Sequence, residues 1–192
     1  MSAAFKDGSS LEGAQDMNAL GVSRLMQFRD SGTLSNPEEA IWYFTIAFGL
    51  TPDGHPDMLA RHANLGVAYT DRYKRLGELI DLQKAIEYKT RALALTPDDH
   101  PDMSQRHASL GVSYIDQYRR LGELTDLEKA IECDIRALEL TPDGHPDMPQ
   151  RHASLGASNR NRYQRLGELA DLEKTIECHT CALALTPDGH PD

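Results

Sequence analysis

The nine residues Leu50–Met58 read LTPDGHPDM, and almost the same nine return at Leu95–Met103 and at Leu140–Met148. The end of the chain, Leu185–Asp192, repeats the first eight of them. Each copy begins 45 residues after the one before. A period of this length predicts stacked structural units, each packed on its neighbours, instead of one compact core.

The repeat extends over nearly the whole chain. Without gaps, residues 58–102 match 103–147 at 31 of 45 positions, and 103–147 match 148–192 at 32 of 45. A more divergent copy precedes them, since Leu20-Gly21-Val22 stands 45 residues before Leu65-Gly66-Val67. We therefore expect four units, at about 17–57, 58–102, 103–147 and 148–192, forming one continuous array after a flexible leader at 1–16.

Each unit has the periodicity of two helices. In the second unit Met58, Leu65, Tyr69 and Tyr73 recur at steps of seven, four and four, which predicts a helix over about 57–76. Gly77 is expected to end this helix in a left-handed conformation. A second helix is expected over about 81–95, with Asp81 as its N-cap, and Asp57 is expected to cap the first one. The first unit should have helices near 17–30 and 36–49.

A glycine recurs inside every first helix, although a helical glycine costs roughly 1 kcal/mol relative to alanine. The four positions are Gly21, Gly66, Gly111 and Gly156. The physical interpretation is close approach, in which the missing side chain lets the second helix of the pair pack against the first.

These features together resemble the tetratricopeptide repeat (TPR). The resemblance rests on Leu65, Gly66, Tyr69, Ala85, Ala92 and Pro97 and on their fourfold recurrence. The period of 45 residues exceeds the usual one of about 34, as in kinesin-light-chain repeats. The repeated sequence is similar to that of repeat arrays of basidiomycete fungi. The resemblance implies an all-α fold of the α–α superhelix class, a right-handed solenoid of stacked antiparallel helix pairs.

The resemblance also implies a function. Proteins of this family are non-enzymatic scaffolds that hold a partner peptide or domain on the concave face lined by the first helices. The corresponding positions, which point away from the packing stripe, are Asn64, Val67, Asp71, Ser109, Val112, Asp116, Ser154 and Asn161. Their carboxylates favour a neutral or basic ligand. The alternative is a sensor or regulatory repeat arm, a fragment of a larger signalling ATPase or CHAT-type protease.

The amino-acid composition limits the classes of partner that the chain is expected to bind. The formal net charge of −10 argues against nucleic acid, because phosphate binding needs a cationic face. We expect no membrane partner, and the N-terminus lacks the pattern of a secretion signal, so a cytoplasmic location is expected. The last unit ends where another first helix would begin. Three interpretations stay open: a polar cap formed by Asn159, Arg160 and Asn161, a fragment of a longer array, and self-association through an uncapped last repeat.

Candidate reactive groups all have structural interpretations, so we expect no catalytic residue, no metal, no cofactor and no enzymatic activity. His-Pro-Asp, the tripeptide of J-domain co-chaperones, recurs with the repeat at His55, His100, His145 and His190 and is interpreted as a turn and helix cap. Cys178 and Cys181 have no second Cys pair for zinc and are interpreted as drift. His62, His107 and His152 are expected to pack between helices.

Overall fold

The computed structural model describes residues 7–31 and 37–186, and within these ranges it contains eight α-helices and no strand. The expected all-α class is confirmed for this part of the chain. The helices are α1 (Asp7–Ser31), α2 (Pro37–Leu50), α3 (Met58–Leu76), α4 (Leu79–Ala94), α5 (Met103–Leu121), α6 (Leu124–Glu139), α7 (Met148–Leu166) and α8 (Leu169–Leu185).

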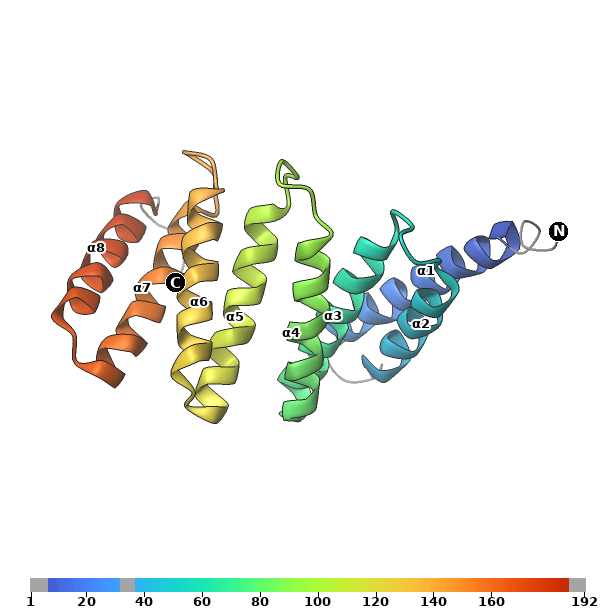
Figure 1. Ribbon diagram of the computed structural model, residues 1–192, viewed down its shortest axis with the longest axis horizontal. Coiled ribbons are helices and arrows are strands. Elements are labelled where there is room, and N and C mark those ends of the chain that lie inside the picture. Colours follow the sequence, from blue (N-terminus) through green and yellow to red (C-terminus); the bar gives the residue numbers. More distant parts are fainter. Residues whose placement is uncertain (1–6, 32–36, 187–192) are drawn as a thin grey trace. The chain divides into compact units, whose positions relative to one another are not determined.

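The helices form two compact units, Met1–Thr96 and Pro97–Asp192. Each unit holds two antiparallel hairpins, α1–α2 and α3–α4 in the first and α5–α6 and α7–α8 in the second (Figure 1). Within a unit the second helix of one hairpin packs on the first helix of the next, α2 on α3 and α6 on α7. This is the stacking that a 45-residue repeat predicts.

Each unit has its own apolar core. In the first unit Phe44 from α2 is 1% exposed and packs with Leu65 of α3 and Ala85 of α4. In the second unit Leu127 and Ile131 of α6 pack with Leu155 of α7 and Cys178 of α8. The buried residues therefore come from both helices of a hairpin and from the next hairpin, so no hairpin buries its apolar face alone.

The first helices end as the sequence predicts. Gly77 has a φ of 71°, and its backbone N–H donates a hydrogen bond to the carbonyl oxygen of Tyr73. Gly122 and Gly167 repeat this geometry with φ values of 72° and 75°. Because a positive φ suits glycine, the Leu-Gly-Glu-Leu turn sets the position at which these three hairpins reverse.

The glycines inside the first helices allow close approach, as predicted. A Cβ atom placed on Gly66 would lie 2.9 Å from the Cγ of Lys89 and 3.3 Å from its backbone nitrogen. A Cβ atom on Gly21 would lie 2.5 Å from a ring carbon of Phe44. The absence of a side chain is therefore what brings the two helices of a hairpin together.

We predict that Gly21→Ala destabilises the protein by about 1–3 kcal/mol, because the new methyl group must displace the buried ring of Phe44. Gly49→Ala is the matched control, since Gly49 is also helical but a Cβ there meets no atom within 4 Å. That change should stabilise the protein by about 0.5–1 kcal/mol. Urea unfolding followed by circular dichroism measures both variants, and equal shifts of the midpoint would contradict the close-approach interpretation.

The second helices begin earlier than predicted, so the assignment of Asp81 as an N-cap is wrong. Helix α4 begins at Leu79, which places Asp81 in its first turn. The carboxylate of Asp81 is buried and accepts two hydrogen bonds from Arg72 of α3, at 2.6 and 2.8 Å. The physical reason for the difference is that a partner on the neighbouring helix competes successfully with local capping.

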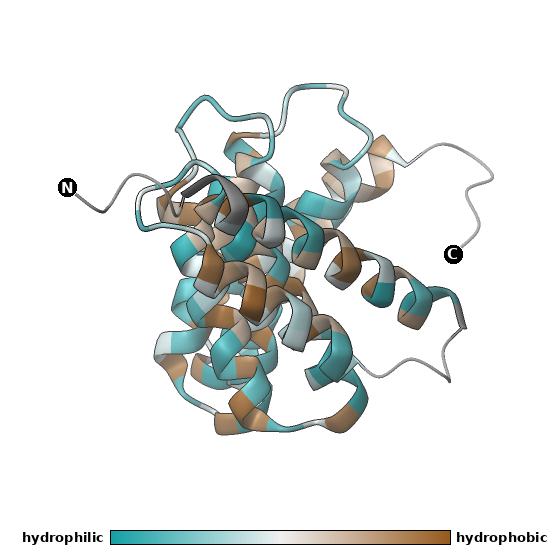
Figure 2. Cartoon of the chain, turned by 90° about the vertical axis from the view of Figure 1, so that its right-hand side faces the viewer, coloured by the Kyte–Doolittle hydropathy of each residue, from teal (hydrophilic) through white to brown (hydrophobic). Residues whose placement is uncertain are grey.

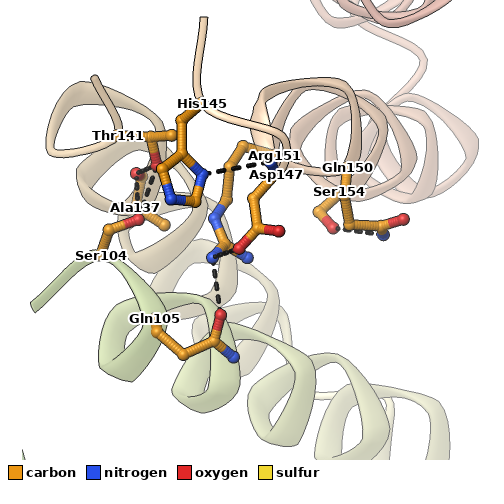
Figure 3. A network of polar contacts seen from close by, with 9 residues as sticks. All are labelled: Ser104, Gln105, Ala137, Thr141, His145, Asp147, Gln150, Arg151 and Ser154. Atoms are coloured by element: carbon orange, nitrogen blue, oxygen red, sulfur yellow. Dashed lines mark hydrogen bonds and ion pairs between the residues drawn. The ribbon is translucent and has the colours of Figure 1, made fainter. Parts of the chain in front are cut away.

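The aspartates before the first helices also lack a capping role, which corrects the prediction for Asp57. Neither Asp57 nor its counterparts Asp102 and Asp147 make a side-chain cap bond. In the turn before α7, the backbone N–H of Asp147 donates to Nδ1 of His145 (3.1 Å), and the Asp147 carboxylate accepts from Arg151 at 2.9 Å (Figure 3). The His-Pro-Asp motif thus forms a turn, as expected, but its histidine does the local bonding. His190 lies outside the described residues.

Helix α1 begins at Asp7, whereas the sequence analysis expected a flexible leader at 1–16 and a helix from about 17. The extra turns pack on α2: Ala14 is fully buried, and the hydroxyl of Ser10 donates to the carbonyl oxygen of Leu50 at 3.2 Å. This contact satisfies a carbonyl at the C-terminal end of α2. The sequence of the first repeat has diverged from the others, so the contact between the start of α1 and α2 could not be predicted from the repeat pattern.

Hydrophilic and hydrophobic residues are interspersed along the helices (Figure 2). Among the described residues there is accordingly no helix with the length and apolar character that crossing a lipid bilayer requires.

A candidate binding pocket between α5 and α7

In the first unit the predicted binding residues contact the preceding hairpin. The side-chain amide of Asn64 donates to Oδ1 of Asn18 at 2.8 Å, and Asp71 forms an ion pair with Arg29 at 2.7 Å. Val67 packs against the apolar core. These three residues of α3 therefore hold α1 and the core in place in this structure.

In the second unit the predicted residues lie around a pocket between α5 and α7. Val112 and Asp116 line it from α5, and Ser154 and Asn161 line it from α7. Its volume is about 150 Å³. Ser109 lies one turn before Val112, is half-buried and is not part of the lining. The helical phase derived from the sequence thus identifies four of the five predicted positions in this unit as neighbours in space.

The pocket has residues that the sequence analysis missed. Ile115 and Arg119 of α5 and Ser158 of α7 line it, and so does Asp134, which comes from the second helix α6. Asp134 is 4% exposed, and its Oδ2 accepts a hydrogen bond from the hydroxyl of Ser158 at 2.6 Å. A buried carboxylate therefore stands among the apolar and hydroxyl groups that line the pocket.

Burial raises the pKa of Asp134 to about 6. The hydrogen bond from Ser158 and the positive charge of Arg151 act in the opposite direction but do not cancel the effect of desolvation. Arg151 itself is paired with Asp147 and donates to Gln105 (Figure 3). The Asp134 carboxylate is ionised at neutral pH but has no ion-pair partner among the described residues.

The pocket lining includes a second carboxylate, that of Asp116. Asp116 pairs with the exposed Arg119 at 3.4 Å. Val112, Ile115 and the small Ala157 supply apolar surface. With these groups the pocket can accept a side chain that is apolar along its length and polar or positively charged at its tip.

One sequence signal could have identified Asp134. The chain has a different chemical type at this position in every repeat, namely Phe44, Lys89, Asp134 and His179, whereas the glutamates two residues earlier, Glu87, Glu132 and Glu177, recur. The second helices were interpreted only as packing elements, so this variation was not weighed.

The recurrent histidines pack between helices where the contacts are described. The ring of His62 lies 5.1 Å from Phe48 and 5.8 Å from Tyr88, measured between centroids, and is buried. Burial lowers the pKa of His62 and of His107. Both imidazoles are therefore neutral at physiological pH.

The cysteines are all free thiols. Cys178 is buried in the core of the second unit, and burial raises its pKa. Cys181 is half-buried on α8. Within residues 7–31 and 37–186 there is no cluster of three or more His, Cys, Asp or Glu side chains that could hold a metal ion.

Another surface feature lies on α2, where Glu38, Glu39, Trp42 and Tyr43 surround a shallow hollow. The indole of Trp42 is 58% exposed and contacts Tyr43 edge-on.

Comparison with known proteins shows the fold. The sequence matches no protein-family model and no curated protein. Its structure is similar to that of MamA, with a TM-score of 0.60 and 18% identity, covering 90% of this chain and 77% of that one. It is also similar to a putative kinesin light chain from Podospora anserina with nearly identical TPR-like repeats, with a TM-score of 0.58 and 16% identity over 93% and 79% of the two chains.

Proposed function

The chain has the all-α superhelical repeat fold of TPR-like proteins, and we propose that it is a non-enzymatic scaffold that binds a neutral or basic peptide of a partner protein. The proposed site is the pocket between α5 and α7. The observation that carries the proposal is the convergence there of Val112, Asp116, Ser154 and Asn161, which packing does not explain. Binding a peptide in this pocket requires only apolar contacts, hydrogen bonds and charge, which these side chains supply.

The first unit contributes less to this proposal. Asn64 and Asp71 are already paired with α1, so a ligand there would have to replace the bonds to Asn18 and Arg29. Charge complementarity favours a basic ligand in the second unit, where the lining carries two carboxylates and one guanidinium. The expected cytoplasmic location and the absence of nucleic-acid binding belong to the same proposal.

A pocket-filling substitution tests the site. Heptapeptides selected on the purified chain from a random phage-displayed library serve as probes, and their affinity is measured by fluorescence anisotropy. Ala157→Phe is expected to weaken binding at least about tenfold, because the ring would occupy the pocket that Ala157 lines. Ala170→Phe, at an exposed position at the start of α8, is the matched control and should leave affinity unchanged.

Two results would contradict the proposal. If the library yields no peptide that binds the chain, it is not a peptide scaffold. If Ala157→Phe and Ala170→Phe bind the selected peptides equally well, the peptides bind at another surface.

Two further predictions from the sequence concern assembly. Self-association through the last repeat is supported by the exposure of α8, where Ile176 is 59% and Leu183 is 78% exposed while the equivalent Ile131 is 5% exposed. Sedimentation velocity of the purified chain at increasing concentration tests it, and a constant monomer would contradict it.

The alternative of a regulatory arm of a larger ATPase or CHAT-type protease would use the same pocket, and the sequence of the encoding locus beyond Asp192 tests it.

A further inference from the structure

One position of the second helix reaches the face of the first helix in every repeat, and it does so through the gap left by the recurrent glycine. A Cβ atom on Gly111 would lie 2.9 Å from Oδ1 of Asp134, and one on Gly156 would lie 3.0 Å from the ring of His179. The equivalent contacts in the first unit join Gly21 with Phe44 and Gly66 with Lys89. The repeated glycine thus makes room for a side chain whose type changes from repeat to repeat.

The variation at this position is chemical as well as steric. An aromatic ring, an ammonium, a carboxylate and an imidazole follow one another in four repeats, although the last three of these repeats agree at about two positions in three. Packing alone would favour one apolar residue throughout, because a buried charged group costs free energy unless it is paired. A role in recognition explains why charged groups stand there.

Asp134 is the member of this series that lines the pocket between α5 and α7. Its Oδ2 is bonded to Ser158, while its Oδ1 has no hydrogen-bond partner among the described residues and lies beside Gly111. The charged groups around it are Arg151 from α7, which is paired with Asp147, and Asp116 and Arg119 from α5, which pair with each other. The carboxylate therefore lacks a counter-charge of its own.

We propose that Asp134 determines the specificity of this pocket by binding the ammonium or guanidinium group of a lysine or arginine in the partner peptide. This inference rests on the proposed function. The cation would pair with Oδ1, and the methylene groups of its side chain would contact Val112, Ile115 and Ala157. The pocket volume of about 150 Å³ is several times the roughly 30 Å³ of one water molecule, so it has room for the end of a side chain.

The raised pKa of Asp134 is consistent with this proposal, because a desolvated carboxylate without a partner gains most from an incoming cation. Binding should accordingly strengthen as Asp134 ionises with rising pH.

The test compares two substitutions of Asp134 with a control. Random heptapeptides are selected on the wild-type chain and on Asp134→Asn, Asp134→Lys and Asp143→Asn. The last variant changes the net charge by the same amount as Asp134→Asn, at an exposed turn residue of the same unit. A lysine is sterically precedented at this position, since Lys89 occupies it in the second repeat. Circular dichroism establishes whether each variant is folded. If Asp134→Lys is not folded, the comparison of the wild type with Asp134→Asn decides the test.

We expect the wild type and Asp143→Asn to select peptides enriched in lysine or arginine at one position. Asp134→Asn should bind those peptides at least about tenfold more weakly, as the loss of a charged hydrogen bond predicts, and Asp134→Lys should select aspartate or glutamate there. The inference would be overturned if basic peptides bound the wild type and Asp134→Asn equally well but bound Ala157→Phe weakly. That result would leave the proposed function intact. Selection of no peptide at all would overturn both.

Discussion

Arg72→Met is expected to lower the free energy of unfolding by about 3–5 kcal/mol, whereas Arg72→Gln is expected to cost much less. The guanidinium of Arg72 donates two hydrogen bonds to Asp81, whose side chain is only 2% exposed. Methionine would leave that carboxylate buried without a partner. Glutamine keeps a donor, and the third repeat uses that arrangement, since Gln117 donates to the buried Asp126 at 3.2 Å. The midpoint of urea unfolding measures both variants.

Two controls accompany this prediction. The last repeat has the same bidentate pair between Arg162 and Asp171, so Arg162→Met should be as costly as Arg72→Met. Arg91→Met breaks a pair with Glu87 in which both side chains are about 60% exposed, and it should cost less than about 1 kcal/mol. If the substitutions of Arg72 and Arg91 have equal effects, the hairpins do not depend on the buried pair.

The helices and hairpins were predictable because their signals are local and repeated. Gly77 ends α3 through its own backbone conformation, and Gly66 is needed because the partner helix belongs to the same repeat. The errors arose where a longer-range partner intervenes. A carboxylate near the start of a helix predicts a cap, but Asp81 bonds Arg72 on another helix, and capping preferences contain no information about that residue.

The candidate site was predictable to the extent that helical phase determines it. Val112, Asp116, Ser154 and Asn161 share one phase in neighbouring first helices, and they surround one pocket. Asn64 and Asp71 share that phase too, but their partners Asn18 and Arg29 come from the diverged first repeat, where the pattern no longer predicts contacts. Asp134 lies outside the phase rule altogether, because it reaches the pocket from the second helix.

Asp134→Asn is expected to raise the free energy of unfolding by about 2 kcal/mol at pH 7.5 and to leave it unchanged near pH 4. Burial raises the pKa of Asp134 in the folded state from 3.8 to about 6. Between these values the folded state binds more protons than the unfolded state, so wild-type stability falls as the pH rises through this window. The shift of about two units corresponds to about 3 kcal/mol above pH 6, and the desolvated amide of asparagine offsets part of the gain.

The comparison between variant and wild type isolates this group. His62 and His107, whose pKa values are lowered by burial, destabilise the folded state below about pH 6.5, but they do so in both proteins and cancel in the difference. Urea midpoints are measured from about pH 4 to about pH 8, with Asp143→Asn as the exposed control. A difference that is the same at every pH would mean that Asp134 is ionised without penalty in the folded protein.

The two experiments on Asp134 together separate a structural carboxylate from a binding one. If the carboxylate only supported the fold, its replacement by asparagine would lower the stability of the protein and leave its affinity for the peptide unchanged. We expect the opposite combination, a more stable chain that binds basic peptides less well, since the free energy that the buried charge costs in the free protein is recovered when a cation enters the pocket. Adding a selected basic peptide should then raise the unfolding midpoint of the wild type more than that of Asp134→Asn.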